Sequence, residues 1–416
     1  MKVRLILLSA AIALSAVTLV GCESEKNTNI SGGEGDAATT STAQKNADDD
    51  IETETPEIYY VTPSDLGFEC QYDADLGGLI VEKYLGRDEA IRIPDEIGGY
   101  PVKRITIGGS ENLQIEFVIP DGTTEIEERA FMGSGLTSVV IPNSVTTIGA
   151  GAFSGCKYLT SIDIPDSVTE IGLDIKFNDV INDYGTAENA GAFGGCVGLT
   201  DVKLPDNLKT IVHGTFLNCS SLTKLTIPNS VTYIGACAFY GCSSLKELTI
   251  PDSVKTIDRG TFYECSSLEI INIPDGVTFV YEDSYSGEKH ENMLYYTFCG
   301  CTSLTRVKIP NGVTDIGYCA FFRCTSLAEI IFPDSIKTIG ASTFEGCSNL
   351  TELILPDGLE TAETFAFVDC TELTAITVPA SVTEIVNLAF GYEAVSNTSF
   401  KKKEIEIRCP SGSTAE

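Results

Sequence analysis

Pairs of apolar residues that alternate with variable ones recur along the chain, and a proline follows each pair. Leu225 and Ile227 precede Pro228, and the next copy places Leu248 and Ile250 before a proline. Such prolines stand at positions 94, 120, 142, 165, 205, 228, 251, 274, 310, 333, 356 and 379, and most steps between them are 22 or 23 residues. Alternation with a period of two predicts one short strand per repeat, which has its apolar face inward and ends at the proline.

Each repeat continues with a turn and a second apolar segment. Asp, Asn, Ser or Gly follows the proline and predicts a turn, and then come pairs such as Val231 and Ile234. An aromatic residue and a cysteine spaced like Phe239 and Cys242 complete the unit. Because a unit of this size buries its apolar side chains only against its neighbours, the period predicts a solenoid of about 12 coils with stacked core columns.

Nine of the 15 cysteines occupy one position of the repeat. Their side chains are expected about 4.8 Å apart, which exceeds the usual Cβ separation of a disulfide, so they are predicted to be buried free thiols. The nine are Cys156, Cys196, Cys219, Cys242, Cys265, Cys301, Cys324, Cys347 and Cys370. Zinc is the alternative, but the chain has no C-x-x-C pair and only two histidines, so no metal site is predicted.

The unit L-x-x-[LI]-x-[IL]-P-[DN]-[SG]-V-x-x-I-G-x-x-A-F-x-x-C resembles the BspA-like leucine-rich repeats of bacterial surface proteins, over about residues 90–395. The resemblance implies a repeat solenoid, a right-handed leucine-rich-repeat coil with short parallel β-strands. It also implies adhesion or protein binding outside the cytoplasm, without catalysis. Residues 58–102 are similar to the small N-terminal β-cap that precedes such repeats.

Both ends of the chain differ from the repeats. Residues 1–22 are basic and then apolar, and they end in Leu-Val-Gly-Cys. This resembles a bacterial lipoprotein signal in which Cys22 is lipidated, although an ordinary cleaved signal is the alternative. Residues 23–57 are predicted to form a disordered acidic tether, and residues 396–416 a C-terminal cap and tail. The protein is therefore predicted to be exported, anchored by lipid and displayed on the bacterial cell surface.

The net charge of −32 argues against nucleic acid or an anionic lipid surface as the main partner. No cofactor is predicted, and a monomer is expected. The expected partner is a protein or glycan on a host or neighbouring cell surface.

Residues two and four positions before each proline are predicted to face outward from the strands. In the C-terminal half they combine a basic pair with isoleucines, and we predict that this strand face contacts the partner. The candidate residues are Ile270, Asn272, Arg306, Lys308, Glu329, Ile331, Glu352 and Ile354. Cross-strand pairing of Lys308 with Glu329, beside isoleucines that merely suit a sheet, is the alternative.

Two steps of the repeat are longer than the rest, and their extra residues are roughly 173–189 and 282–294. Both insertions enter at the same point of the unit, so they are predicted to emerge along one edge. They are candidate binding loops, with Asp179, Asp183, Tyr184, Asp283, Tyr285 and His290 as candidate residues. Tolerated surface insertions are the alternative. The other histidine, His213, is expected to be exposed.

These observations favour an adhesin-like binding protein. A structural protein that organises the envelope by binding another envelope component is the alternative. An enzyme ranks last, because the chain has no glycine-rich phosphate loop and no G-x-S-x-G nucleophile motif.

Overall fold

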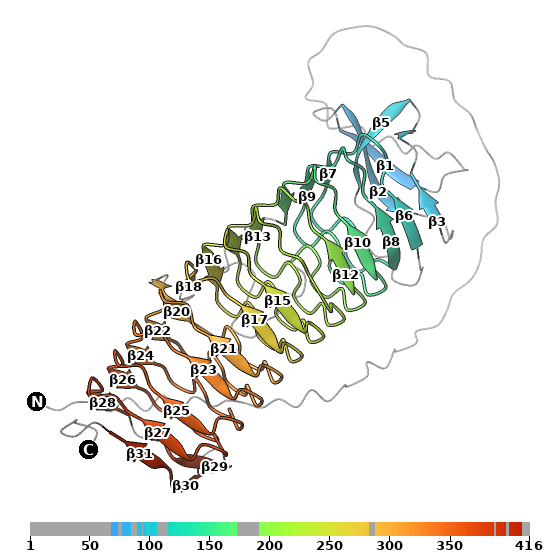
Figure 1. The fold of residues 1–416 in the computed structure, drawn as a ribbon. Coiled ribbons are helices and arrows are strands. Elements are labelled where there is room, and N and C mark those ends of the chain that lie inside the picture. The colour runs from blue at the N-terminus through green and yellow to red at the C-terminus, as the bar shows by residue number, and fades with distance from the viewer. Residues whose placement is uncertain are drawn as a thin grey trace, which may run out of the picture. The chain divides into compact units, whose positions relative to one another are not determined.

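The computed structural model of the chain describes residues 68–73, 77–84, 90–93, 95–97, 99–105, 115–172, 191–282, 288–386, 388–396 and 399–409. These residues form short strands joined by turns, stacked as a solenoid (Figure 1). None of them forms a helix long and apolar enough to span a membrane. The predicted signal segment and the acidic tether lie outside the described residues, so their limits stay predictions.

Strands from successive turns form the front ladder, which consists of five parallel-paired groups of two or three strands (Figure 1). These are the strands that the alternating pattern predicts. The ladder consists of β3 (Ala90–Arg92), β6 (Ile115–Val118), β8 (Leu136–Val140), β10 (Ser161–Asp163), β12 (Asp201–Lys203), β15 (Glu247–Thr249), β17 (Ile270–Asn272), β21 (Arg306–Lys308), β23 (Glu329–Ile331), β25 (Glu352–Ile354), β27 (Ala375–Thr377) and β31 (Glu406–Arg408). The last strand, β31, pairs in parallel with β27 and so continues the ladder.

The prediction of one strand per repeat is wrong, because a second parallel ladder follows the turn. This edge ladder consists of β7 (Glu125–Ile126), β9 (Thr147–Ile148), β11 (Glu170–Ile171), β13 (Thr210–Ile211), β14 (Tyr233–Ile234), β16 (Thr256–Asp258), β18 (Thr278–Glu282), β20 (Met293–Leu294), β22 (Asp315–Ile316), β24 (Thr338–Ile339), β26 (Thr361–Ala362) and β28 (Glu384–Ile385). Most of these strands have only two residues, which is too short for an alternating pattern to show.

The repeat around Pro228 also departs from its prediction. Residues 222–228 adopt no strand, although Leu225 and Ile227 are buried as expected. The apolar residues of this repeat are therefore buried like those of its neighbours, although the front ladder has no strand here.

A column of phenylalanines fills the core along the solenoid. Adjacent rings lie 5.1–5.8 Å apart between centroids and are parallel to within 20°. The column contains Phe131, Phe153, Phe193, Phe216, Phe239, Phe262, Phe298, Phe321, Phe344, Phe367 and Phe390. One ring per turn thus defines 11 consecutive turns, close to the predicted 12.

The cysteine column is buried and its thiols are free, as its spacing predicts. The sequence did not show that each thiol also donates a hydrogen bond to the phenylalanine carbonyl of the preceding turn, at 3.0–3.2 Å. Cys242, for example, donates to Phe216. Burial raises the pKa of Cys265 to about 12, so the thiol stays protonated and keeps its donor. The column is therefore both apolar filling and a line of hydrogen bonds.

Each turn includes residues in the left-handed backbone region. Many are glycines, such as Gly214 at φ 61° and Gly260 at φ 60°. Tyr296 at φ 54° and Phe365 at φ 62° occupy the same position in other turns. A left-handed backbone costs a residue with a Cβ about 1–2 kcal/mol, so side chains at these places are held against a preference for glycine.

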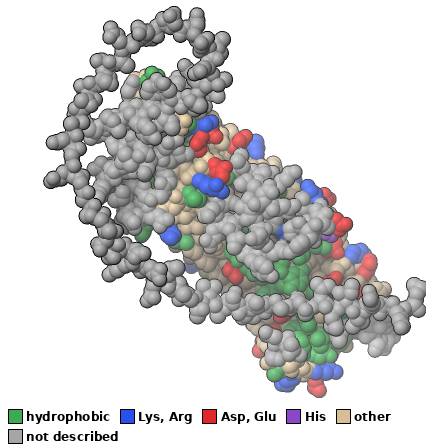
Figure 2. Space-filling model, turned by 180° about the vertical axis from the view of Figure 1, so that it is seen from behind, with side chains coloured by type: hydrophobic (Ala, Val, Ile, Leu, Met, Phe, Trp, Pro, Cys, Tyr) green, Lys and Arg blue, Asp and Glu red, His purple; other side chains and the backbone are tan. Residues whose placement is uncertain are grey.

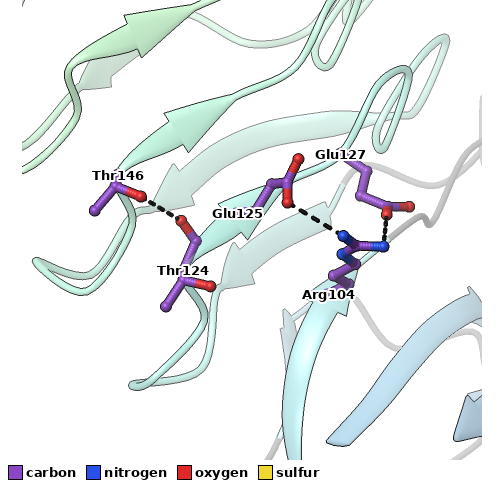
Figure 3. Close-up of polar contacts among 5 residues, drawn as sticks. All are labelled: Arg104, Thr124, Glu125, Glu127 and Thr146. Atoms are coloured by element: carbon purple, nitrogen blue, oxygen red, sulfur yellow. Dashed lines mark hydrogen bonds and ion pairs between the residues drawn. The ribbon is translucent and has the colours of Figure 1, made fainter. Parts of the chain in front are cut away.

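At the N-terminal end, a small sheet precedes the ladders, as predicted. It runs in the order β1 (Phe68–Asp73), β2 (Gly78–Tyr84), β5 (Tyr100–Ile105) and β4 (Glu96–Ile97). Arg104 of β5 forms ion pairs with Glu125 at 3.4 Å and Glu127 at 2.8 Å (Figure 3). In the next turn Thr146 donates to the carbonyl of Thr124 at 3.2 Å (Figure 3). Arg104 thus joins the cap to the edge ladder.

At the C-terminal end, β29 (Tyr392–Ser396) and β30 (Ser399–Lys402) form an antiparallel hairpin before β31. The Nζ atom of Lys403 donates to the carbonyls of Cys370 and Thr371. Lys403 therefore bonds to the last turn that carries a column cysteine.

Candidate binding surfaces

The front ladder presents its outward residues as a strand face. Ile270 is 60% exposed and Ile354 is 75% exposed. Asn272, Glu329 and Glu352 are also exposed. The structure therefore places most of the predicted residues on one surface, where large apolar side chains lie among polar ones. Ile331 departs from the prediction because it is only half-exposed.

Charged residues of the strand face pair with one another, but not as the alternative predicted. Register places Arg306 opposite Glu329 and Lys308 opposite Ile331. The Arg306 guanidinium accordingly lies 3.2 Å from Glu329. The predicted Lys308–Glu329 pair is wrong, because the Lys308 ammonium reaches back to Asp275, 2.8 and 2.9 Å from its two carboxylate oxygens. The predicted basic pair is thus neutralised within the protein, and these exposed ion pairs contribute little to stability.

The second insertion forms part of a hairpin rather than a loop. Strand β18 pairs antiparallel with β19 (Lys289–Glu291), which places Tyr281 opposite His290. The two rings stack at 5.5 Å, and Tyr281 stacks on Tyr295 at 4.0 Å. The Arg259 guanidinium lies 5.2 Å from the centre of the Tyr281 ring. His290 is therefore half-buried in an aromatic stack at the root of the insertion.

His213 is half-buried and hydrogen-bonded, so the expectation that it is exposed is wrong. Its Nδ1 accepts from the backbone N–H of Ala236 at 2.8 Å. Its ring meets Tyr233 edge to face at 6.2 Å. The Tyr233 hydroxyl donates to Asp258 at 3.1 Å, and burial raises the pKa of that carboxyl group. Side chains from three turns meet here because Gly235 leaves room: a Cβ at that position would lie 2.9 Å from the His213 Nδ1.

Four tyrosines and a phenylalanine continue this aromatic surface across successive turns. We call this set the tyrosine stripe: Tyr240, Tyr263, Tyr296 and Tyr318, whose rings contact one another, and Phe322, which follows a column phenylalanine as Tyr240 and Tyr263 do. The rings of Tyr240 and Tyr263 stack at 4.8 Å, Tyr296 lies 5.9 Å from Tyr263, and Tyr318 lies 5.2 Å from Tyr296. All five side chains are half-buried. Figure 2 shows hydrophobic side chains gathered over the middle and C-terminal half of the side opposite to the view of Figure 1.

Burial also sets the protonation of the stripe. It raises the pKa of Tyr240 and of Tyr318 to about 12. The hydroxyls therefore stay neutral at physiological pH. The Tyr263 hydroxyl is hydrogen-bonded to the Cys299 thiol, whose pKa burial raises to about 12. These groups are suited to binding, since none is in the ionised form that a nucleophile or general base requires.

A known repeat matches the part of the chain that builds these surfaces. The BspA type leucine rich repeat region is present in six copies, over residues 109–182, 186–294 and 291–410. The chain belongs to the BspA-type leucine-rich-repeat family. Curated proteins show no match to the sequence.

Solved structures share the architecture of this BspA-type chain. A leucine-rich repeat protein from Bacteroides ovatus is 27% identical, with a TM-score of 0.50 over 80% of this chain and 92% of that one. A leucine rich cell surface protein from Faecalibacterium prausnitzii is 28% identical, with a TM-score of 0.52 over 84% of this chain and 95% of that one. The pneumococcal vaccine antigen PcpA is 18% identical, with a TM-score of 0.51 over 83% of this chain and 86% of that one, which shows the fold alone.

Several predicted residues of the BspA-type chain lie outside the described residues. They are Cys22, Asp179, Asp183, Tyr184, Asp283 and Tyr285. Within the described ranges, no group of three or more His, Cys, Asp or Glu side chains is arranged to hold a metal ion.

The tyrosine stripe and the His213 contacts were missed from the sequence. The signal was present, because Tyr240 and Tyr263 each follow a column phenylalanine. Tyr296 lies two residues before the next one, Phe298. Aligning the repeats on the phenylalanine would have shown the shared position of Tyr240 and Tyr263, but Tyr296 and Tyr318 occupy other positions of their turns.

Proposed function

We propose that this BspA-type protein is a lipid-anchored surface protein that binds a protein or glycan partner through its strand face, without catalysis. Family membership and the likeness to a protein described as a cell surface protein support the location. The lipoprotein-like segment that ends in Cys22 supports the anchor.

The observation that carries the binding role is the exposure of Ile270 and Ile354 on a face whose Arg306 and Lys308 already have partners. Exposed apolar side chains on a protein this acidic gain free energy when a partner covers them. Binding through this face should therefore depend weakly on salt, because the ion pairs are internal.

Binding is tested with the variant Ile270→Ser/Ile354→Ser on arrays of host matrix proteins and glycans. We expect at least about a tenfold loss of affinity for the ligand found, since two exposed side chains lose their apolar contact. Val395→Ser is the matched control, because Val395 is 66% exposed but lies in β29, outside the front ladder. Equal affinity of both variants would exclude the strand face.

The anchor is tested with Cys22→Ala. The parent protein should be released from intact cells by protease and should partition with membranes, whereas the variant should appear in the soluble fraction. Protection of the parent protein from protease on intact cells would instead favour the envelope-organising alternative.

A further inference from the structure

The tyrosine stripe contains an aromatic residue that the fold itself does not require. Tyr296 has a φ of 54°, and the equivalent positions Gly151, Gly214 and Gly260 have φ values of 61°, 61° and 60°. Glycine adopts this conformation without the cost that a Cβ brings. The core ring of the same turn is Phe298, which stacks within its own column. Other turns, such as those of Cys237 and Phe365, also carry a side chain at this position, so what distinguishes Tyr296 is its ring contact with Tyr263 and Tyr318.

Rings on this side of the solenoid already carry guanidinium groups. The Arg323 guanidinium lies 5.0 Å from the centre of the Phe322 ring, within the stripe. Arg259 lies over Tyr281 in the same way at 5.2 Å. A planar guanidinium is attracted to an aromatic face by cation–π interaction, and it stacks there better than a compact ammonium does. The local chemistry of the surface is therefore suited to arginine.

Two carboxyl groups flank the stripe without an ion-pair partner in the described ranges. They belong to Glu264, which follows Tyr263, and to Glu345, which follows the column residue Phe344. Partial burial raises the pKa of both carboxyl groups. Loss of hydration is the one cause of this rise at Glu264, whereas the nearby Arg323 guanidinium offsets part of it at Glu345. An incoming cation would offset that loss, and the net charge of −32 favours the approach of a basic partner.

The separation of the two carboxyl groups along the solenoid limits the spacing of the cations that can bind both. Three turns separate the phenylalanines Phe262 and Phe344 in the core column. At about 4.8 Å per turn, this corresponds to roughly 14 Å, which an extended polypeptide covers in about four residues. Tyr296, Tyr318 and Phe322 belong to the two turns between these points, so their rings line the path.

We propose that the tyrosine stripe, with Glu264 and Glu345, is a second binding surface that takes an extended polypeptide segment carrying two arginines about four residues apart. The arginines pair with the two carboxylates, and the rings contact the guanidinium planes and the apolar stems between them. A neutral oligosaccharide is the less suited occupant, because it would supply no cation to either carboxylate. This surface is separate from the strand face.

The test measures the affinity of the full-length protein for a synthetic glycine-threonine peptide with two arginines in that spacing, by fluorescence anisotropy at physiological salt. The variant Tyr263→Ser/Tyr318→Ser should bind about tenfold more weakly, because two ring contacts are lost while the net charge is unchanged. Tyr158→Ser is the matched control, since Tyr158 is 46% exposed and outside the stripe. A peptide with lysines in place of the arginines should bind the parent protein more weakly.

Several outcomes would overturn the proposal. They are equal affinity of the stripe and control variants, equal affinity for the lysine and arginine peptides, and preferential binding of a neutral oligosaccharide at the stripe. The variant Tyr263→Phe/Tyr318→Phe keeps both rings and should keep its affinity even if the serine variant unfolds. Loss of affinity in the phenylalanine variant would show that the rings are not the contact.

The strand-face variant Ile270→Ser/Ile354→Ser should bind the arginine peptide as the parent protein does. If it does not, the peptide uses the strand face and the stripe is excluded. This measurement distinguishes the two surfaces. If the strand-face variant loses only the strand-face ligand, the result bears on the proposed function and not on the stripe.

Discussion

Two aromatic columns run next to each other through the middle of the solenoid, because Phe239 is followed by Tyr240 and Phe262 by Tyr263. The phenylalanine column is buried except at its last ring, the half-buried Phe390, and its adjacent rings are parallel to within 20° through its length. The tyrosine stripe is half-buried and limited to a few turns, and its rings meet at angles from 9° to 82°. Regular stacking accompanies a role in the core, whereas the irregular stack lies where a partner can reach it.

The comparison is tested most strongly by removing one ring from each column. Phe239→Ala should lower the free energy of unfolding by about 3–5 kcal/mol, because it leaves a cavity in a fully buried stack. Tyr240→Ala should cost only about 1–2 kcal/mol, since part of its ring already contacts water. Urea denaturation followed by circular dichroism measures both, and equal losses would remove the distinction between the columns.

A second contrast concerns the thiols beside the phenylalanine column. Cys242→Ala should lower the free energy of unfolding by about 1–3 kcal/mol, because the Phe216 carbonyl loses one of its two donors and keeps only the backbone N–H of Cys219. Cys242→Ser should cost less than the alanine variant, since a hydroxyl still donates. Ser134 supports this expectation: it occupies the column position before Cys156, and its Oγ lies 3.3 Å from the Cys156 sulfur. If serine cost as much as alanine, the cysteines would act only as apolar filling.

Replacing Tyr296 with glycine should separate stability from binding. The backbone at φ 54° gains about 1 kcal/mol, and the lost ring contacts with Tyr263 and Tyr318 cost a similar amount. Stability should therefore change little, while affinity for the arginine peptide falls about fivefold. Arg129→Gly is the control, because Arg129 has a φ of 58° in a turn outside the stripe. It should gain stability and leave binding unchanged.

The smallest expected effect is a pH dependence from Glu345. Burial raises the pKa of its carboxyl group, so the folded state binds the proton more tightly than the unfolded chain does. The stabilisation this gives is fully present below the unfolded pKa and is lost as the pH rises through the folded pKa. Glu345→Gln should therefore be more stable than the parent protein at about pH 7, by up to about 0.5 kcal/mol. The difference should shrink toward about pH 4, and a difference that grows on acidification would contradict the assignment.

Regular features of the fold were predictable because they repeat. The phenylalanine and cysteine columns and the front ladder follow from residues that recur at a fixed step. When the repeats stack, equivalent residues can only lie above one another. The edge ladder escaped prediction because strands such as Tyr233–Ile234 carry only one outward and one inward residue.

The surfaces were less predictable, because their neighbours come from other turns. The exposure of His213 was predicted from its own repeat alone, yet its contacts are with Ala236 and Tyr233 in the next turn. Lys308 was assigned to Glu329 without the register that places Ile331 opposite it. The contacts of a variable residue can be predicted only when adjacent repeats are aligned on their core residues.

The thiol-to-carbonyl bond has a consequence for how such genes change length. Each bond joins a turn only to the one before it, as Cys242 joins Phe216 and Cys265 joins Phe239. When unequal recombination adds or deletes one whole unit, every remaining thiol still has a phenylalanine carbonyl in the preceding turn to which it can donate. The core therefore forms with any number of units. The tyrosine stripe and its two flanking glutamates, by contrast, require particular units in an uninterrupted order. Selection on copy number would then act through the binding surface, and the interior would impose no preferred length.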